Sequence, residues 1–465
     1  MLNLQPCPPS CQPARRDITR RTIAQCQGAR RDAARHNTVA HWLHRSLMVT
    51  GLLAALPAAA IDFGPFSLNG FAKAEVQRGT NICTDCQREA GENRQRQWAD
   101  DIVYGKRFGT ETTHVTLAQP YIGVKQDVGA GFKVFGLWSQ RWRDGKVDLP
   151  GWLYERNVGI SHEDYGSLRI GSMTTRGWSV ADYPYGTNVG VSDAWGSSGA
   201  GYGLLSNAVR YMSRKLDVLE GDLVLEATYD KGKSGWNKNK PSFVEIYGQF
   251  VKGDLVVDAM VQLARNGEPV AWGHAPFGGL TPFPADDSKL GSSGQSMAMA
   301  MARYQIDAKI EVSGGIRFNR CSGAYAVQTT TGPLGQWNNM FNVDWGGTRD
   351  GVPNPGYAAR SMDLMLGLRY RMGAWTGSTG VVHLGKASTD NPSERGQSNT
   401  LTINTLGLSY SFGNGLQAYG LAGVVNYGRK GLAPLSMPSH NAFTNVDSRV
   451  ATRGNWFGAG AVYTF

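Results

Sequence analysis

The sequence predicts an all-β protein that folds as a transmembrane, antiparallel, up-and-down β-barrel of about sixteen strands. Three observations predict this fold class. Apolar and polar residues alternate in about sixteen segments, the connections between these segments are alternately short and long, and the chain ends on an aromatic residue. A period of two is typical of strands that have one apolar face, whereas the apolar face of a helix repeats about every 3.6 residues.

The composition also favours strands over membrane-spanning helices. The 465 residues include 60 Gly, 13 Trp and 18 Tyr, while hydrophobic residues make up only 41%. No apolar run reaches the roughly 18 residues that a membrane-spanning helix requires. A membrane-spanning strand needs an apolar residue only at every second position, so a barrel fits this composition.

Residues 1–60 are predicted to be an N-terminal extension followed by a signal peptide, and residues 61–465 to be the barrel domain. The apolar stretch "LMVTGLLAALPAAA" (47–60) follows His44 and Arg45 and ends in small residues. This is the pattern of a secretory signal, here with cleavage after Ala60. A short buried helix is the alternative interpretation.

Removal of the first 60 residues changes the charge of the chain. The whole sequence has 47 basic and 37 acidic residues, and this segment holds 8 Arg and 2 Asp, which leaves 39 basic and 35 acidic residues. The net charge then falls from +10 to about +4. A nucleic-acid partner is therefore not expected.

The cysteines give little support to a metal site. Cys7, Cys11 and Cys26 lie in the predicted extension. Cys83 and Cys86 form a "CTDC" stretch, but no second pair or nearby histidine completes four zinc ligands. A disulfide within a loop, or simply two thiols there, is the favoured interpretation, and neither a metal nor another cofactor is expected.

The first and last predicted strands illustrate the alternation. In "FSLNGFAKAEVQ" (66–77), one face holds the apolar residues and the other holds Lys73 and Glu75. In "GAGAVYTF" (458–465), the two aromatic residues Tyr463 and Phe465 share one parity with Ala459 and Ala461. Backbone polar groups in lipid must be paired within the protein, so the meander is expected to close, with the last strand beside the first. Phe465 would then lie at a membrane interface.

The connections between predicted strands are of two lengths. Short ones occur at 127–131, 163–166, 251–254 and 412–415, and long ones at about 79–112, 173–206, 266–293, 318–360 and 428–454. When short and long connections alternate along the chain of an up-and-down meander, all short turns lie at one end of it and all long loops lie at the other. Outer-membrane barrels are built in this way.

Several segments resemble strand–turn–strand units of the Gram-negative general diffusion porins. They are "RNVGISHEDYGSLRIGS" (156–172), "NAVRYMSRKLDVLEGDLVLEATYDKG" (207–232), "YSFGNGLQAYGLAGVVNYG" (410–428) and the terminal "GAGAVYTF". The resemblance covers most of residues 61–465 and is weak through 266–360. It departs from the family pattern at Gly171-Ser172, where that pattern has Gly-Arg, and the third loop lacks the acidic stretch that is usual in the family.

The resemblance implies a function and a setting. It implies an outer-membrane homotrimer of sixteen-stranded barrels, each with a third loop, residues 173–206 here, folded inward to narrow the pore. Ions and small hydrophilic solutes would cross this water-filled channel by passive diffusion, with outer-membrane lipid around it. The barrel-assembly machinery is the expected partner of the C-terminal strand that ends in Phe465.

The residues that line the channel follow from the same alternation. A charge on the lipid face at mid-membrane costs about 2–4 kcal/mol, so charged residues opposite the apolar parity should point inward. The expected pore-lining and constriction residues are Arg141, Arg143, Arg169, Arg210, Arg214, Arg369 and Arg371 on the wall, with Asp182 and Asp193 on the third loop. Because positive charge prevails in this set, a mild preference for anions is expected.

The aromatic residues of the third loop allow two interpretations. They could stack with sugars or aromatic solutes along a track, or they could fill the space that holds an inward loop against the wall. The second interpretation is favoured. The residues concerned are Trp178, Tyr183, Tyr185, Trp195 and Tyr202.

Other functions are less well supported by the sequence. A substrate-selective channel for a sugar or organic acid is the main alternative, and a loop-presenting adhesin or a barrel enzyme follows. The sequence has neither a G-x-S-x-G nor an H-E-x-x-H motif. An enzymatic activity and catalytic residues are therefore not expected.

Overall fold

A computed structural model describes most of the predicted barrel domain. The described residues are 61–80, 112–147, 155–186, 189–192, 195, 202–231, 242–265, 270–273, 280–282, 294–322, 325–327, 348–349, 352–353, 358–386, 388–389, 400–428 and 453–465. All of them belong to one compact unit, Pro57–Phe465. The predicted signal peptide, Cys83 and Cys86 lie outside the described residues.

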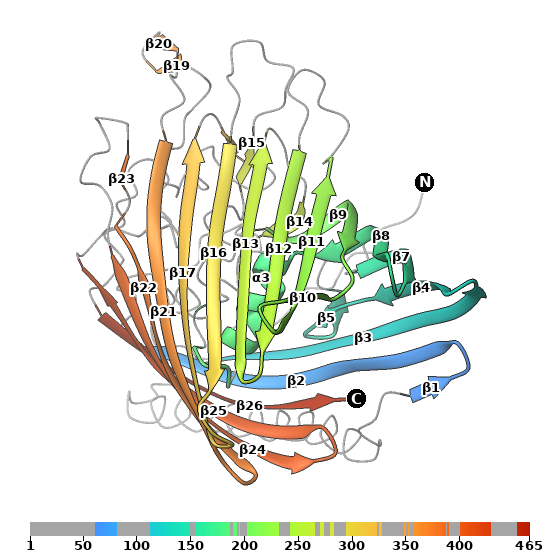
Figure 1. Cartoon of the computed structure of the whole chain (residues 1–465). Helices are drawn as coiled ribbons and strands as arrows, with labels where there is room; N and C mark the ends of the chain where they lie inside the picture. The colour runs from blue at the N-terminus through green and yellow to red at the C-terminus, as the bar shows by residue number, and fades with distance from the viewer. Residues whose placement is uncertain are drawn as a thin grey trace, which may run out of the picture. The chain divides into compact units, whose positions relative to one another are not determined.

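Sixteen long antiparallel strands form a closed barrel, as the sequence predicts (Figure 1). They are β2 (Phe66–Thr80), β3 (Thr112–Gly129), β4 (Phe132–Ser139), β7 (Glu155–His162), β8 (Gly166–Thr174), β9 (Tyr202–Met212), β11 (Gly221–Asp230), β12 (Ser242–Lys252), β13 (Leu255–Arg265), β16 (Gly294–Gln305), β17 (Ile310–Ser322), β21 (Ala358–Met372), β22 (Trp375–Leu384), β24 (Leu401–Gly413), β25 (Leu416–Tyr427) and β26 (Arg453–Thr464). Each strand pairs with the next along the chain.

Shorter strands extend this sheet or form two separate two-stranded sheets. They are β1 (Ile61–Phe63), β5 (Trp142–Arg143), β6 (Lys146–Val147), β10 (Leu216–Val218), β14 (Val270–Gly273), β15 (Leu280–Pro282), β18 (Tyr325–Val327), β19 (Thr348–Arg349), β20 (Val352–Pro353) and β23 (Ser388–Thr389). The two-stranded sheets pair β15 with β18 and β19 with β20.

The last strand closes the barrel against the first. β26 pairs with β2 in a register that sets Gly460 opposite Glu75. At the end of this ladder the backbones of Gly70 and Phe465 exchange two hydrogen bonds of 2.9 and 3.0 Å, and the Phe465 ring stacks on Tyr463. The terminal aromatic residue is thus part of the paired sheet, which confirms the predicted closure.

Short turns and long connections alternate as predicted. Turns of a few residues join β3 to β4, β7 to β8, β10 to β11, β12 to β13, β16 to β17, β21 to β22 and β24 to β25. In the turn after β16, the Asp307 carboxylate accepts hydrogen bonds from the backbone N–H groups of Lys309 and Ile310 (2.7 and 2.8 Å). These bonds hold the pKa of Asp307 below its ordinary value.

The two faces of the sheet differ as expected for a barrel in lipid. Large apolar side chains such as Val158, Leu366 and Leu406 are exposed on the outer face. Polar side chains such as Glu226, Glu245 and Arg369 are buried on the inner face. Because of this alternation, the buried charged side chains lie on the inner face, where protein groups or water can solvate them.

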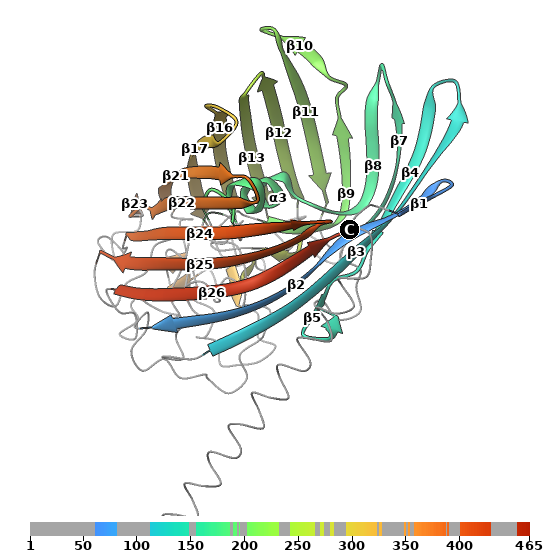
Figure 2. The ribbon, with the colours of Figure 1, turned by 90° about the horizontal axis from the view of Figure 1, so that it is seen from below.

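The third long connection, between β8 and β9, folds into the barrel. It contains the helix α3 (Arg176–Val180) and the wide helical turn η2 (Ala181–Tyr185), and Figure 2 shows α3 inside the ring of strands. The residues from 175 to 201 are called the third segment below. Thr175 caps α3, since its Oγ1 accepts a hydrogen bond from the Trp178 N–H (3.2 Å).

The third segment packs against one side of the inner wall. Tyr185, Val191 and Trp195 share a buried apolar cluster with inward-facing residues of β13, β16, β21, β22 and β24. Wall glycines permit this close approach, because a Cβ at Gly380 would lie 2.5 Å from the carbonyl oxygen of Val191. The inner face of these strands is therefore covered by a protein core.

Candidate functional site

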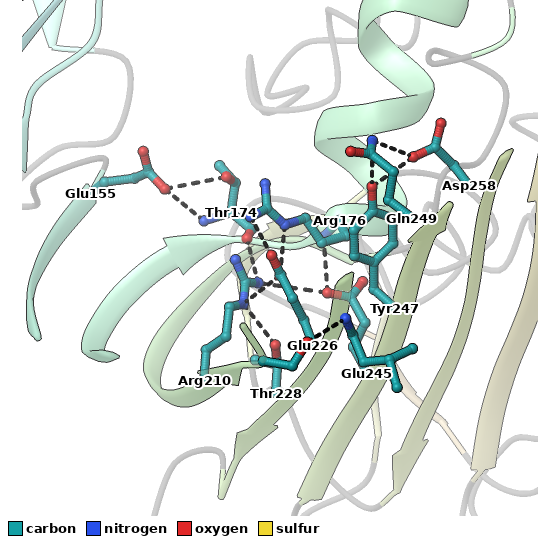
Figure 3. Close-up of polar contacts among 12 residues, drawn as sticks. Glu155, Thr174, Arg176, Arg210, Glu226, Thr228, Glu245, Tyr247, Gln249 and Asp258 are labelled. Carbon is teal, nitrogen blue, oxygen red and sulfur yellow. Dashed lines mark hydrogen bonds and ion pairs between the residues drawn. The ribbon is translucent and has the colours of Figure 1, made fainter. Parts of the chain in front are cut away.

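The start of the third segment is bound to two buried glutamates of the wall (Figure 3). Arg176 donates two hydrogen bonds to the carboxylate of Glu226 on β11, at 2.7 and 2.6 Å. The backbone N–H groups of Arg176 and Gly177 donate to the two oxygens of Glu245 on β12, at 2.8 and 2.9 Å. Charge-assisted bonds of this kind are about twice as strong as neutral ones, so they fix where α3 begins.

Arg210 on β9 completes this group of charges. Its guanidinium donates to Thr228 Oγ1 (2.7 Å) and to the Thr174 carbonyl (2.8 Å), and it lies 3.6 Å from both Glu226 and Glu245. Two arginines and two glutamates therefore balance one another. Arg210, expected from the sequence to add positive charge to the constriction, is thus ion-paired with the two glutamates.

The middle of the third segment is held by a tyrosine pair. The hydroxyl groups of Tyr185 and Tyr247 each donate to a different oxygen of Asp258 on β13, at 3.0 and 2.6 Å. Gln249 donates to the same carboxylate at 2.8 Å. Asp258 is almost fully buried, and these donors compensate for its loss of water.

The far end of the segment rests on a buried ion pair. Arg317 of β17 donates twice to Asp363 of β21, at 3.0 and 2.9 Å, and both side chains are fully buried. The Trp195 ring lies 4.4 Å from the Arg317 guanidinium, and its N–H contacts the sulfur of Met301 at 3.0 Å. The described part of the segment is thus held to the wall at Arg176, Tyr185 and Trp195.

Most aromatic residues of the third segment fill space, as favoured above. Tyr185 and Trp195 are fully buried, and Trp178 packs against the same apolar cluster. Tyr183 differs, because 69% of its surface is exposed. The side chain of Tyr202 lies outside the described residues.

The wall next to Arg210 carries two further arginines. Arg169 is opposite Arg210 in the β8–β9 pairing, and its guanidinium lies 5.1 Å from the Phe135 ring and makes no ion pair with a described residue. Arg141 and Asp182 of the third segment both act electrostatically on the Tyr121 hydroxyl. A positive charge of the wall and a negative charge of the third segment therefore lie near the same tyrosine.

The remaining predicted residues fall into three places. Arg143 is opposite Leu117 in the β3–β5 pairing, on the inner face. Arg369 and Arg371 lie near the turn end of β21 and contact Glu311 of β17 at 3.1 and 3.6 Å. Arg214 is exposed beside the turn that follows β9, away from the contacts of the third segment. Asp193 lies outside the described residues.

Several residues of the site were not selected from the sequence. They are Glu155, Glu226, Glu245, Asp258 and Arg303, all on the inner face or at its edge. A consistent use of the alternation would have found them, because each shares its parity with other polar or lumen-facing positions of its strand.

No metal centre or long apolar helix occurs in the part of the chain that the structure describes. The described residues contain no group of three or more His, Cys, Asp or Glu residues that could hold a metal ion. None of their helices is long and apolar enough to cross a membrane.

The closed sixteen-stranded barrel with an inward third segment defines a class, the channel-forming barrels of the outer membrane. The chain belongs to the Gram-negative porin family, whose sequence pattern matches residues 46–430. No curated protein matches the chain.

Solved structures with the same fold include three outer-membrane proteins of low sequence identity. They are OmpT of Vibrio cholerae (14% identity, TM-score 0.51, 88% of this chain and 100% of that one), the anion-selective porin of Comamonas acidovorans (11%, 0.52, 86% and 99%), and OmpF of Salmonella typhi in complex with daunomycin (12%, 0.50, 88% and 100%).

Family and fold together establish the setting and the general activity. The protein resides in the outer membrane and forms a diffusion channel. They point to a channel rather than an enzyme. The third segment is bound to the inner wall of that barrel at three places.

Proposed function

We propose that the channel passes ions and small hydrophilic solutes passively, with a mild preference for anions. The observation that carries the proposal is Arg169, which lies on the inner face opposite Arg210 and makes no ion pair with any described residue. Arg176 and Arg210, by contrast, are ion-paired with Glu226 and Glu245. Glu155 and Glu226 act on Arg169 only electrostatically, so its guanidinium keeps N–H donors for an anion in the passage.

Reversal potentials of the purified protein in a planar bilayer test this proposal. The wild-type channel should show stepwise ohmic openings and a reversal potential on the anion side in a potassium chloride gradient. Arg169→Gln should shift this potential toward cations, and the shift should shrink as salt rises, because salt screens fixed charges.

Arg156→Gln provides a matched control, since Arg156 is exposed on the outer face opposite Trp138. It should leave the reversal potential unchanged. A wild-type channel that favours potassium over chloride at low salt would contradict the proposed anion preference, but it would not contradict passive diffusion through the channel. Silent bilayers would instead favour a loop-presenting adhesin or an enzyme.

The protein is further proposed to be a homotrimer surrounded by outer-membrane lipid. One of the solved structures is a trimer form of OmpT from Vibrio cholerae, 15% identical with a TM-score of 0.51. The outer face of β25, β26 and β2 supports a subunit contact there, because a run of small residues lies beside the larger Val76 and Phe457. The small residues are Ala418, Gly420, Ala422, Ala459, Ala461, Ala72 and Ala74. Small residues allow membrane proteins to approach closely.

Material from the outer membrane should begin at Ile61 and migrate as an oligomer that heat dissociates. The first expectation follows from the signal pattern before residue 61, and the second from the proposed trimer. N-terminal sequencing and gel migration before and after heating check both. Recovery of Met1 would contradict export by this signal, and migration as a monomer without heating would contradict the trimer.

We also propose that the barrel-assembly machinery binds the strand that ends in Phe465. The support is local geometry, because Phe465 pairs with Gly70 of the first long strand and stacks on Tyr463. A factor that holds this strand would hold the seam at which the barrel closes. The truncation that tests this role is described in the Discussion.

A further inference from the structure

Three arginines surround one glutamate near the turn ends of β16, β17 and β21. Glu311 of β17 lies 3.1 Å from Arg369, 3.6 Å from Arg371 and 3.7 Å from Arg303. These strands are neighbours in the sheet (Figure 1), and the register places Arg369 opposite Glu311. Arg303, Arg369 and Arg371 are called the turn-side arginine cluster below.

The cluster has more positive charge than its surroundings neutralise. Only Arg369 is within close ion-pair distance of Glu311, while the other two arginines remain at 3.6 Å or more. The neighbouring strand β13 offers Asp258, but both of its oxygens already accept hydrogen bonds from Tyr185 and Tyr247. Among the carboxylates that the structure describes near them, the three guanidinium groups therefore share one, Glu311, that other donors do not already bind.

Buried polar atoms of the cluster make few hydrogen bonds, and Glu311 Oε1 itself, 3.1 Å from Arg369, makes none with a described residue. The Nε atoms of Arg303 and Arg369 are buried and meet no acceptor in the part of the chain that the structure describes. Arg371 has one long bond to Gln305 (3.4 Å). The side chains of Arg303 and Arg371 are 32% and 43% exposed, so their remaining N–H groups are accessible from water.

The third segment borders the cluster on its other side. The Pro184 carbonyl accepts a long bond from Arg369 (3.4 Å), and the exposed Tyr183 lies within electrostatic range of the same guanidinium. The cluster thus lies between the third segment and the turns, which face the periplasm in barrels of this class. It is separate from Arg169 and Arg141 on the wall next to Arg210.

We propose that the turn-side arginine cluster is a binding site for a doubly charged oxyanion of the phosphate type. Guanidinium groups match the oxygens of such an anion with paired N–H donors, and two positive charges in excess suit its charge. An anion that has passed the third segment would dwell here before it leaves the channel. The inference rests on the diffusion channel, and it does not depend on the proposed anion preference.

Single-channel recording with inorganic phosphate tests the site. Phosphate at about pH 8, added in low potassium chloride, should reduce the chloride current in a saturable way. The double variant Arg303→Gln/Arg371→Gln should raise the half-blocking concentration about tenfold or more, as expected when two charged donors are lost. Arg371→Gln alone should raise the half-blocking concentration by a smaller factor. This single variant replaces the double variant in the test if the double variant does not assemble.

Two comparisons make the test specific. Arg214→Gln, which removes an exposed arginine beside another turn, should leave the phosphate block unchanged. Acetate, with one charge, should block less well than phosphate at equal ionic strength. If phosphate blocked the wild type and the double variant equally, or if acetate blocked as well as phosphate, the proposed binding site would be wrong. Ohmic openings in the same recordings would still show that the protein is a channel.

Discussion

Replacing Glu226 by glutamine is expected to release the start of the third segment and to enlarge the channel. The carboxylate of Glu226 accepts both side-chain bonds from Arg176, and it also lies near Arg210. Without it, two arginines would share Glu245 alone. Loss of one partner from a buried charge pair costs about 3–5 kcal/mol, which is enough to change how much of the time the segment stays docked.

Single-channel conductance and the uptake of larger solutes measure this release. Both should increase in Glu226→Gln, while the barrel itself stays folded because its ladder of backbone bonds is intact. Glu220→Gln is the matched control, since Glu220 is an exposed glutamate in the turn before β11 and, among the described residues, forms its ion pair with exposed Lys252. Unchanged conductance in Glu226→Gln would show that the contacts of Tyr185 and Trp195 suffice to hold the segment.

Deletion of Phe465 is expected to reduce sharply the amount of assembled barrel. The truncated chain would lose both backbone bonds to Gly70 and the ring that stacks on Tyr463. These contacts lie at the seam, so their loss affects closure rather than a single hairpin. In lipid, unpaired backbone groups at such an edge are costly.

The yield of heat-modifiable protein in outer-membrane fractions measures this effect. Phe412→Ala is a matched control, because Phe412 is an exposed aromatic residue near the turn after β24 and takes no part in closure. It should assemble at close to the wild-type level. Normal yield from the Phe465 deletion would remove the proposed role of this residue in assembly.

The barrel could be predicted from the sequence because its rules are local. Residues such as Lys73 and Glu75 alternate with apolar neighbours, and the alternation alone sets them on the inner face. Turn and loop lengths then give the topology, and the need to pair backbone groups in lipid gives the closure. None of these steps requires knowledge of which side chains meet across the lumen.

The balance of charges inside the barrel could not be predicted in the same way. Arg210 was correctly expected on the inner face, but its neutralisation by Glu226 and Glu245 depends on strands that lie beside it only after folding. The position of Arg176 depends on the path of the third segment, which has no periodic pattern. The alternation along a strand assigns each residue to one face of the sheet. Which residues contact one another on that face depends on the three-dimensional arrangement of the strands.

The core beneath the third segment is rich in methionine. Six methionines of the buried apolar cluster come from the wall strands and the end of β8: Met173, Met260, Met297, Met299, Met301 and Met365. Methionine is flexible and fills irregular gaps, so a surface made of it tolerates changes in what packs against it. Over evolutionary time, residues of the third segment can therefore be substituted while the barrel keeps its structure. Such tolerance accounts for a third segment that lacks the usual acidic stretch and still folds inward.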